Sequence, residues 1–352
     1  MSNRNIVHLL PEFNYTSENY ISFIRDNFDV SKHKFYWSGN LMEINSESKK
    51  TDETLSTINL VKFLFHNKNN KIILHSLFVD FKILLAFSMF MPKNVCWLIW
   101  GGDLYDYKYR DRTLISNISE LLKKIVIRKL SSILTFISGD YDLARRWYRA
   151  KCKNNYVIAY PRNINADLNK YHNSKVDQNL IQVGNSPDPR NNHEEVFRIL
   201  RNKLSQNEHN YKIFCPLAYG SYPERIENLI DLGQSFFGKN SFIPLIKMLP
   251  IDDYISLLTK VRVAIFNHDR QQAIGNLILL LGLGKTVYIR KDIVTWAFCK
   301  DHGLIVRNIA DLQEGKSFDF LSIDEIKQNK KAVLSNFNEQ KAIKTWQKVF
   351  DE

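Results

Sequence analysis

The chain has 352 residues, enough for two domains with separate cores, and its 44% hydrophobic and 24% charged residues are typical of a soluble globular protein. No stretch approaches eighteen consecutive apolar residues and the first residues lack a signal-peptide pattern, so we expect a cytoplasmic protein that is neither membrane-spanning nor secreted. A net charge of +12 indicates anionic partners.

Short apolar runs alternate with amphipathic segments through the first half of the chain. The predicted strands are residues 5–10, 34–37, 71–75, 94–100, 132–137 and 156–160. The predicted helices are residues 18–27, 53–65, 81–90, 113–129 and 141–149. This alternation predicts a parallel sheet covered by helices on both faces.

Two polar residues follow neighbouring predicted strands, where parallel strands expose side chains to ligands. His75 ends the strand KIILH, and Asp103 comes after the strand at 94–100 and two glycines. The glycines permit a sharp turn that exposes the Asp103 side chain. A single strand-end histidine is more often structural than catalytic, so Asp103 is the stronger candidate.

Basic residues concentrate between Lys108 and Lys153. This segment has twelve Lys or Arg and four Asp or Glu, a local net charge of +8. Aromatic residues are interleaved, most densely in RRWYRAKCK at 145–153. Such a patch favours anionic lipid head groups, phosphorylated ligands or nucleic acid. A solvated basic face without a partner is the alternative.

The second half resumes the alternation after a polar, Asn-rich segment. Predicted strands are residues 180–183, 211–217, 242–245, 263–266, 286–289 and 304–306, and predicted helices are 192–204, 223–236, 251–260, 273–283 and 293–301. We therefore expect an α/β protein with domains at 1–162 and 179–335, a linker at 163–178, and a C-terminal helix at 336–352 that packs back on the first domain. Ligands of such sheets bind outside the carboxyl ends of the strands.

Two loops of the second domain have residues that suit a phosphorylated ligand. In IQVGNSPDPRNNHEE (181–195), a strand runs into Gly184, and Asn191 is placed to cap the next helix with Glu194 as its capping-box partner. Glycine lets backbone approach a ligand, and a helix N-terminus attracts anions. In IFNHDRQQAIGNLILLLGLGKTVYI (265–289), Arg270 can bind a phosphate with two hydrogen bonds. Ordinary surface loops would have the same pattern.

Metal sites are not expected. The four cysteines are far apart without Cys-x-x-Cys spacing, and the nine histidines form no metal-binding motif. We expect neither a metal nor another cofactor.

Four segments together resemble glycosyltransferase family 56, the 4-alpha-L-fucosyltransferase-like family. They are WGGDLY at 100–105, VGNSPD at 183–188 with Asn191 and His193, PLAY at 216–219, and RQQAIG at 270–275. The resemblance covers roughly residues 60 to 305. It implies a GT-B architecture, in which two Rossmann-like domains face a cleft. It also implies transfer of 4-acetamido-4,6-dideoxygalactose from dTDP to a polyprenyl-diphosphate-linked glycan in bacterial surface polysaccharide synthesis, such as enterobacterial common antigen or O-antigen.

The resemblance and the strand-end positions together predict four groups of site residues. Asp103 is the expected base for the acceptor hydroxyl, with His75 as alternative or helper. The acceptor should contact Gly101, Gly102 and Tyr105. The donor should contact Gly184, Asn185, Ser186, Asp188, Asn191, His193, Tyr219, Arg270, Gln271, Gln272 and Gly275. The anionic inner face of the membrane should contact Arg145, Arg146, Trp147, Arg149 and Lys151, which makes the protein peripheral there.

Three alternatives stay open at this point. A non-catalytic nucleotide-sugar-binding protein would have the same loops without needing Asp103. A nucleic-acid-binding protein would explain the charge, but no recognition motif is present and we expect no nucleic acid partner. A transferase using a UDP-sugar is the third. Many GT-B enzymes hold the ribose with a glutamate where this chain has about Leu279, and a deoxyribose carrier such as dTDP would lose less from its absence.

Overall fold

The computed structural model describes residues 4–11, 15–38, 57–77, 81–159, 168–171, 179–204, 211–220 and 222–352. The chain forms two compact units, which we treat separately. Unit 1 comprises Met1–Arg162 and Glu339–Glu352, and unit 2 comprises Asn163–Asn338. Each contains a six-stranded parallel sheet, so the predicted α/β class with two doubly wound sheets is confirmed.

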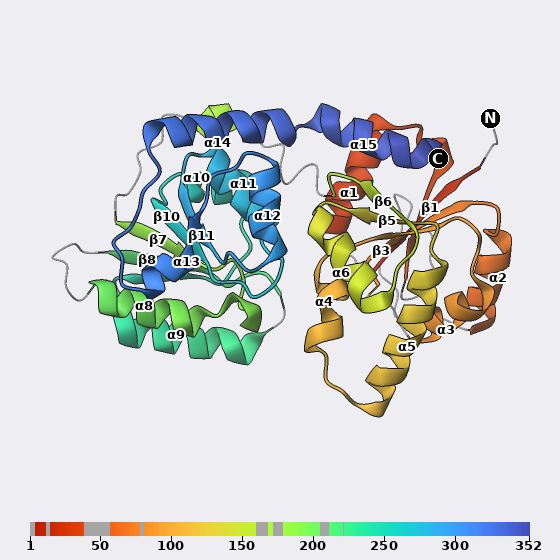
Figure 1. The fold of residues 1–352 in the computed structure, drawn as a ribbon, viewed down its shortest axis with the longest axis horizontal. Helices are drawn as coiled ribbons and strands as arrows, with labels where there is room; N and C mark the ends of the chain where they lie inside the picture. The colour runs from red at the N-terminus through yellow and green to blue at the C-terminus, as the bar shows by residue number, and fades with distance from the viewer. Residues whose placement is uncertain are drawn as a thin grey trace. The chain divides into compact units, whose positions relative to one another are not determined.

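The sheet of unit 1 has the order β2-β1-β3-β4-β5-β6 (Figure 1). Its strands are β1 (Ile6–Leu10), β2 (His33–Trp37), β3 (Lys71–His75), β4 (Val95–Leu98), β5 (Ser132–Thr135) and β6 (Lys153–Tyr156). Every residue of β1, β3, β4 and β5 is buried, which explains why these strands are apolar without alternation.

Helices cover both faces of this sheet. They are α1 (Tyr15–Asn27), α2 (Thr57–His66), α3 (Phe81–Phe90), α4 (Gly102–Tyr109), α5 (Leu114–Lys129), α6 (Ser138–Tyr148) and α15 (Glu339–Asp351). The C-terminal helix α15 packs in this unit: Trp346 is fully buried and its Nε1 donates to the carbonyl oxygen of Ile158 at 3.0 Å. Lys71 Nζ donates to the carbonyl oxygen of Val349.

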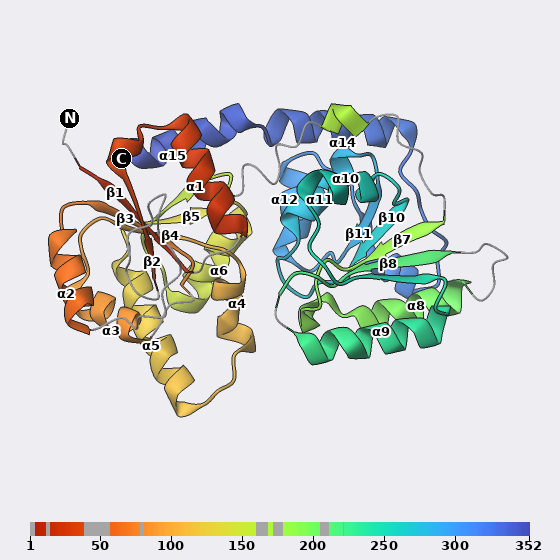
Figure 2. The same cartoon turned by 180° about the vertical axis from the view of Figure 1, so that it is seen from behind.

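The sheet of unit 2 has the order β12-β11-β10-β7-β8-β9. Its strands are β7 (Leu180–Val183), β8 (Lys212–Pro216), β9 (Phe242–Leu245), β10 (Val263–Phe266), β11 (Thr286–Ile289) and β12 (Arg307–Asn308). The views in Figures 1 and 2 show α8 (His193–Leu204) and α9 (Pro223–Phe237) on one face and α10 (Ile251–Leu258), α11 (Ile274–Gly282) and α12 (Val294–Asp301) on the other. Two further helices, α13 (Ile309–Gln313) and α14 (Ile323–Asn336), follow.

Several elements differ from the prediction, including helices α13 and α14, which were not predicted. Strand β6 begins at Lys153, earlier than the predicted 156–160. Its first residues are polar, so no apolar run marks them as a strand, and they form one because they pair with β5 at the edge of the sheet. Strand β12 follows the predicted 304–306. The glycines before Asp103 lead into helix α4 and not into a simple turn.

Part of the predicted organisation falls on residues that the structure does not describe. These are residues 53–56 of the predicted helix at 53–65, residue 160 of the predicted strand at 156–160, and 163–167 and 172–178 of the predicted linker. Between the two linker segments, η2 (Leu168–Tyr171) is a 3-10 helix.

Candidate functional site

The sheet of unit 2 reverses its direction of winding between β7 and β10. From β7 the chain moves outward to β8 and β9, and it then returns to place β10 on the other side of β7. Ligands of doubly wound sheets bind at such a switch point, outside the carboxyl ends of the strands. The segments that leave these two strands, residues 184–192 and 267–273, are therefore the first place to look for a site.

The turn after β7 requires glycine. Gly184 has a positive φ of 65°, and a Cβ there would lie 2.6 Å from His193 Nε2 and 2.7 Å from Asn191 Oδ1. The next backbone amide, of Asn185, donates to Asn191 Oδ1 at 2.9 Å. The close approach of backbone to the start of α8 thus fixes the shape of this loop.

Asn191 joins the two loops. Its Oδ1 also lies 2.9 Å from His268 Nε2, and its Nδ2 donates to Ser186 Oγ at 3.3 Å. Asn191 lies in the 3-10 helix η3 (Pro189–Asn191), and α8 begins at His193. The predicted capping box from Asn191 to Glu194 is therefore wrong, because the side chain is used within the loop and Glu194 pairs with Arg225 at 3.0 Å.

Arg270 reaches the same place from the loop after β10. Its guanidinium forms an ion pair with Asp188 at 2.7 Å, and both side chains are about 15% exposed. The neighbouring Gln272 donates to Ser186 Oγ at 3.3 Å. A partly buried cation, a hydroxyl and a carboxamide therefore lie together beside the Gly184 turn. This combination suits a diphosphate, which needs positive charge and several hydrogen-bond donors.

Two buried histidines, His193 and His268, lie beneath the loops that carry Ser186 and Arg270. Burial lowers the pKa of His193 to about 4 and that of His268 to about 3, so both rings are neutral near pH 7. Neither ring nitrogen of His193 has a hydrogen-bond partner among the described residues. His193 is fully buried beneath Gly184, so its support of the turn is observed, whereas direct contact with a donor stays a prediction.

The remaining predicted donor residues lie at the same edge. Gln271 is half-buried, and its carbonyl oxygen accepts from Arg270 at 3.0 Å. Gly275 lies in the first turn of α11, and a Cβ there would meet open space. Tyr219 follows β8 and is 56% exposed. The roles of these three residues in donor binding rest on their position and stay predictions.

Asp103 in unit 1 is completely buried, so the predicted exposure of its side chain is wrong. Its Oδ2 accepts from the Leu77 amide at 2.9 Å and from Trp97 Nε1 at 2.8 Å. Its Oδ1 accepts from the amides of Trp100 at 3.1 Å and Leu104 at 3.0 Å. Four donors thus occupy both oxygens. The structure supports a role in holding β3, β4 and α4 together, and the predicted role as a base stays a prediction.

His75 belongs to a row of buried histidines across three adjacent strands. His8 Nδ1 lies 3.1 Å from His75 Nε2, and His8 Nε2 lies 2.9 Å from His33 Nδ1. Trp346 of α15 stacks on His75 with ring centroids 6.4 Å apart. Burial lowers the pKa of His75 to about 3. In this arrangement His75 contacts core residues, and its catalytic role also stays a prediction.

The predicted acceptor residues surround the start of α4. Gly101 has a φ of 93° and precedes the helix, which begins at Gly102. Tyr105 is only 6% exposed and its hydroxyl donates to Asp140 Oδ1 at 3.2 Å. The Tyr105 ring therefore packs inside the unit, and the two glycines shape the approach to α4.

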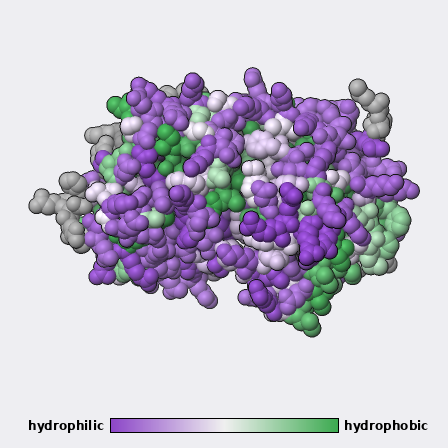
Figure 3. All heavy atoms as spheres, in the orientation of Figure 1, coloured by the Kyte–Doolittle hydropathy of each residue, from purple (hydrophilic) through white to green (hydrophobic). Residues whose placement is uncertain are grey.

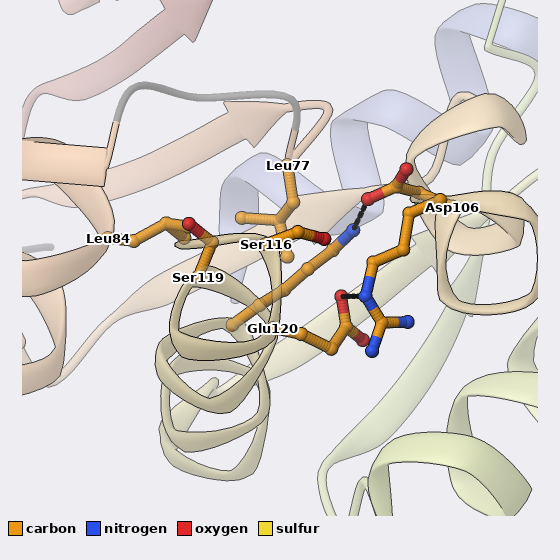
Figure 4. Close-up of a pocket in the computed structure, with 8 residues that line it drawn as sticks. Leu77, Leu84, Asp106, Ser116, Ser119 and Glu120 are labelled. Atoms are coloured by element: carbon orange, nitrogen blue, oxygen red, sulfur yellow. Dashed lines mark ion pairs between the residues drawn. The ribbon is translucent and has the colours of Figure 1, made fainter. Parts of the chain in front are cut away.

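A polar pocket of about 290 Å³ opens beside α4 and the first half of α5 (Figure 4). Two ion pairs border it: Lys123 with Asp106 at 3.7 Å, and Arg110 with Glu120 at 4.0 Å. Lys123 Nζ also donates to the carbonyl oxygen of Asp103, which links the pocket to the buried carboxylate. Asp106 keeps 35% of its side chain exposed, so a hydroxyl in the pocket can reach it.

Comparison with known proteins identifies the family. The family model described as 4-alpha-L-fucosyltransferase glycosyl transferase group 56 matches residues 17–349. This chain belongs to glycosyltransferase family 56. The earlier resemblance is therefore confirmed over nearly the whole chain.

Solved structures share the GT-B fold of this family-56 protein at very low sequence identity. An alpha,alpha-trehalose 6-phosphate synthase from Burkholderia multivorans has a TM-score of 0.66 at 10% identity, over 99% of this chain and 96% of that one. Sucrose-phosphate synthase from Thermosynechococcus elongatus gives 0.67 at 10% identity, over 99% and 98%. WaaG, a glycosyltransferase involved in lipopolysaccharide biosynthesis, gives 0.57 at 10%, over 98% and 94%.

Several residues near the switch point were not predicted from the sequence. Arg225 donates through Nε to the carbonyl oxygen of Pro187 at 2.8 Å, and Arg190 pairs with Asp269 at 3.4 Å. Burial raises the pKa of Tyr222, and nearby Asp188 raises it further. Arg225 and Tyr222 come from the segment before and within α9, and no motif marked them. The capacity of Asp106 to line a pocket was also missed, although its spacing of three from Asp103 places it one helical turn further on.

The predicted membrane residues form one cationic notch in the family-56 protein. Arg145, Arg146, Arg149 and Lys151 line it together with Asp142, at the C-terminal end of α6. Trp147 instead stacks on Tyr107 of α4, with ring centroids 5.2 Å apart. Within the described parts of the chain, every helix is too short or too polar to cross a bilayer.

Proposed function

We propose that this glycosyltransferase transfers a 4-acetamido-4,6-dideoxyhexose from dTDP to a polyprenyl-diphosphate-linked oligosaccharide in bacterial surface polysaccharide synthesis. The observation that carries the donor half is the convergence of Arg270, Ser186 and the Gly184 turn at the switch point of unit 2. The nucleotide specificity and the acceptor come from the family resemblance. UDP is the alternative carrier.

In this proposal the donor diphosphate lies against the Gly184 turn and Arg270. Asp188 orients the guanidinium through their 2.7 Å contact, so the cation is already positioned before the ligand arrives. Gln271, Gln272 and Gly275 are assigned to the sugar. Charge on the leaving diphosphate is offset by Arg270 and by the N-terminal ends of α8 and α11. The reaction then requires no metal, which chelation of the enzyme before assay tests directly.

We assign the acceptor to unit 1, at the pocket beside α4. Asp106 is the carboxylate that an acceptor hydroxyl can reach, because it is partly exposed while Asp103 is not. Asp103 holds α4 in place through its four hydrogen bonds and thereby positions Asp106 one turn further along the helix. The cationic notch of α6 is assigned to the anionic membrane surface, where a polyprenyl-linked acceptor resides.

A panel of nucleotide sugars tests the donor assignment. Ligands that bind only the folded protein raise its melting temperature by mass action. We expect dTDP-4-acetamido-4,6-dideoxygalactose to stabilise the wild type and not the Arg270→Gln variant. Mass spectrometry of a lipid-linked acceptor after incubation should show addition of that sugar. Stabilisation by UDP-sugars alone would refute the nucleotide assignment, and binding without transfer to any acceptor would favour a non-catalytic binding protein.

A further inference from the structure

Unit 1 has an apolar surface that its own fold leaves uncovered. The first two turns of α5 expose Leu114 (77%), Ile115 (72%), Ile118 and Leu121 to solvent. Helix α3, which packs beside α5, exposes Leu85 and Met89 one helical turn apart. Figure 3 shows apolar residues gathered over the beginning of α5. We call these six residues the apolar ridge.

The apolar ridge is not needed for the core of unit 1. The opposite side of α5 supplies Leu122, Val126 and Ile127, which are buried against the sheet. Thr113 caps the helix by accepting from the Ser116 amide at 3.2 Å, so the first turn is ordered without burying Leu114 or Ile115. In both views of the fold, the start of α5 extends beyond the neighbouring helices of unit 1 (Figures 1 and 2).

The charge around the apolar ridge identifies its partner. Between residues 81 and 131, exposed basic side chains outnumber exposed acidic ones, since Asp111 is the single exposed acid. The exposed basic residues there are Lys82, Lys93, Lys108, Arg112, Arg128 and Lys129. The cationic notch is linked to this region through aromatic packing, because Trp147 stacks on Tyr107 and the Arg110 guanidinium lies 5.9 Å from the same Tyr107 ring.

Exposed apolar side chains at a helix end, on elements that carry more exposed Lys and Arg than Asp and Glu, are typical of helices that lie in the interface of an anionic bilayer. A protein partner would need acidic side chains around its own apolar patch, whereas an anionic bilayer offers both features everywhere. We propose that the apolar ridge inserts into an anionic lipid bilayer, with the basic residues around it on the head groups. This inference rests on the proposed function only in that a lipid-linked acceptor requires the enzyme at a membrane.

Vesicle binding of the purified chain, without any sugar substrate, tests this inference separately from the enzymatic one. The probe is phosphatidylcholine vesicles with and without phosphatidylglycerol, at low and high salt. The variant is L114S/I115S/I118S, which removes exposed side chains only. The matched control is I246S/I323S/L334S, because these three residues of unit 2 are exposed apolar side chains as well.

We expect the wild type to bind phosphatidylglycerol vesicles and the L114S/I115S/I118S variant to bind them at least about tenfold more weakly, since each apolar side chain adds to partitioning. High salt should screen the basic contribution and leave an apolar remainder in the wild type only. The control should bind within about twofold of the wild type, because its changes lie outside the apolar ridge. Stabilisation by the donor should be unchanged in both variants.

Three results would overturn the inference. The first is wild-type vesicle binding by the L114S/I115S/I118S variant, and the second is an equal loss in the control. The third is a dimer in sedimentation experiments that this variant dissociates, together with no binding of the wild type to vesicles, which would assign the apolar ridge to a second copy of the chain. Quenching of an Ile115→Trp variant by brominated acyl chains, measured against the wild type, gives an independent readout of insertion.

Discussion

The substitution Asp103→Asn separates a structural carboxylate from a catalytic base. An asparagine keeps one oxygen, and its least costly orientation leaves that oxygen with Leu77 and Trp97, because the Leu104 amide also donates to the Gly101 carbonyl at 2.9 Å. The Trp100 amide then loses its acceptor, and the new amide group faces other donors. The buried new amide group facing donors costs about 1–3 kcal/mol and the lost part-buried bond from Trp100 about 0.5–1.5 kcal/mol, which predicts a loss of about 1.5–4.5 kcal/mol in the free energy of unfolding.

Urea unfolding followed by tryptophan fluorescence and circular dichroism measures this loss. Asp106→Asn is the matched control, since Asp106 lies on the same helix, its side chain is 35% exposed and its ion pair with Lys123 is 3.7 Å long, while Lys123 keeps its bond to the Asp103 carbonyl. We expect the control to lose at most about 1 kcal/mol of stability. Because Asp106 is the proposed base, Asp106→Asn should instead lower turnover by about two to four powers of ten.

The two kinetic outcomes are opposite for the two roles. If Asp103 were the base, Asp103→Asn would lose turnover per folded molecule, while Asp106→Asn would stay active. That pair of results would refute our assignment of Asp106. Turnover is compared per folded molecule, without urea and at a temperature well below the thermal unfolding transition of both variants.

Four further measurements follow from the described contacts. Arg270→Gln should lower kcat/KM for the donor about 10- to 150-fold, the value of a hydrogen bond to a charged group, while Arg198→Gln, exposed on α8, should leave it unchanged. Gly184→Ala should destabilise by about 2–4 kcal/mol, against about 1–2 kcal/mol for Gly303→Ala, which shares a positive φ but has open space for a Cβ. The pKa of His75 is about 3 in the folded protein against 6.5 in the unfolded chain, so the unfolded state binds more protons between these pH values. The free energy of unfolding should therefore fall by about 1.4 kcal/mol for each pH unit below 6.5, and His75→Gln should reduce this slope in unfolding experiments. In calorimetry dTDP should bind more tightly than UDP, and equal affinities would remove the argument from the missing glutamate.

Most of the fold was predictable because its strands are buried on both faces. Four-residue apolar runs such as those at β4 and β10 have no polar alternation, and their spacing by amphipathic helices leaves few alternatives. The errors occurred where this signal is absent. Strand β6 reads KNNY, and it is a strand because β5 supplies hydrogen-bond partners and not because of its own composition.

The site was less predictable, because its side chains are used in ways that sequence position does not reveal. Asp103 follows a buried strand and two glycines, which is also where a catalytic carboxylate would stand. What distinguishes the two cases is the number of donors around the oxygens. They come from the loop after β3 (Leu77), from β4 (Trp97) and from α4 (Leu104). No local pattern encodes that convergence.

Strand order explains why the unit 2 loops were nonetheless identified. Residues 184–188 and 267–272 are distant in the sequence, yet they lie together because β7 and β10 are neighbours on either side of the switch point. Any doubly wound sheet with this strand order brings these two loops together. Residues suited to a phosphorylated ligand were therefore enough to identify the loops as a site. The fine contacts, Asn191 with His268 and Arg270 with Asp188, then depend on the Gly184 turn, since a side chain at that position would occupy the space of Asn191 itself.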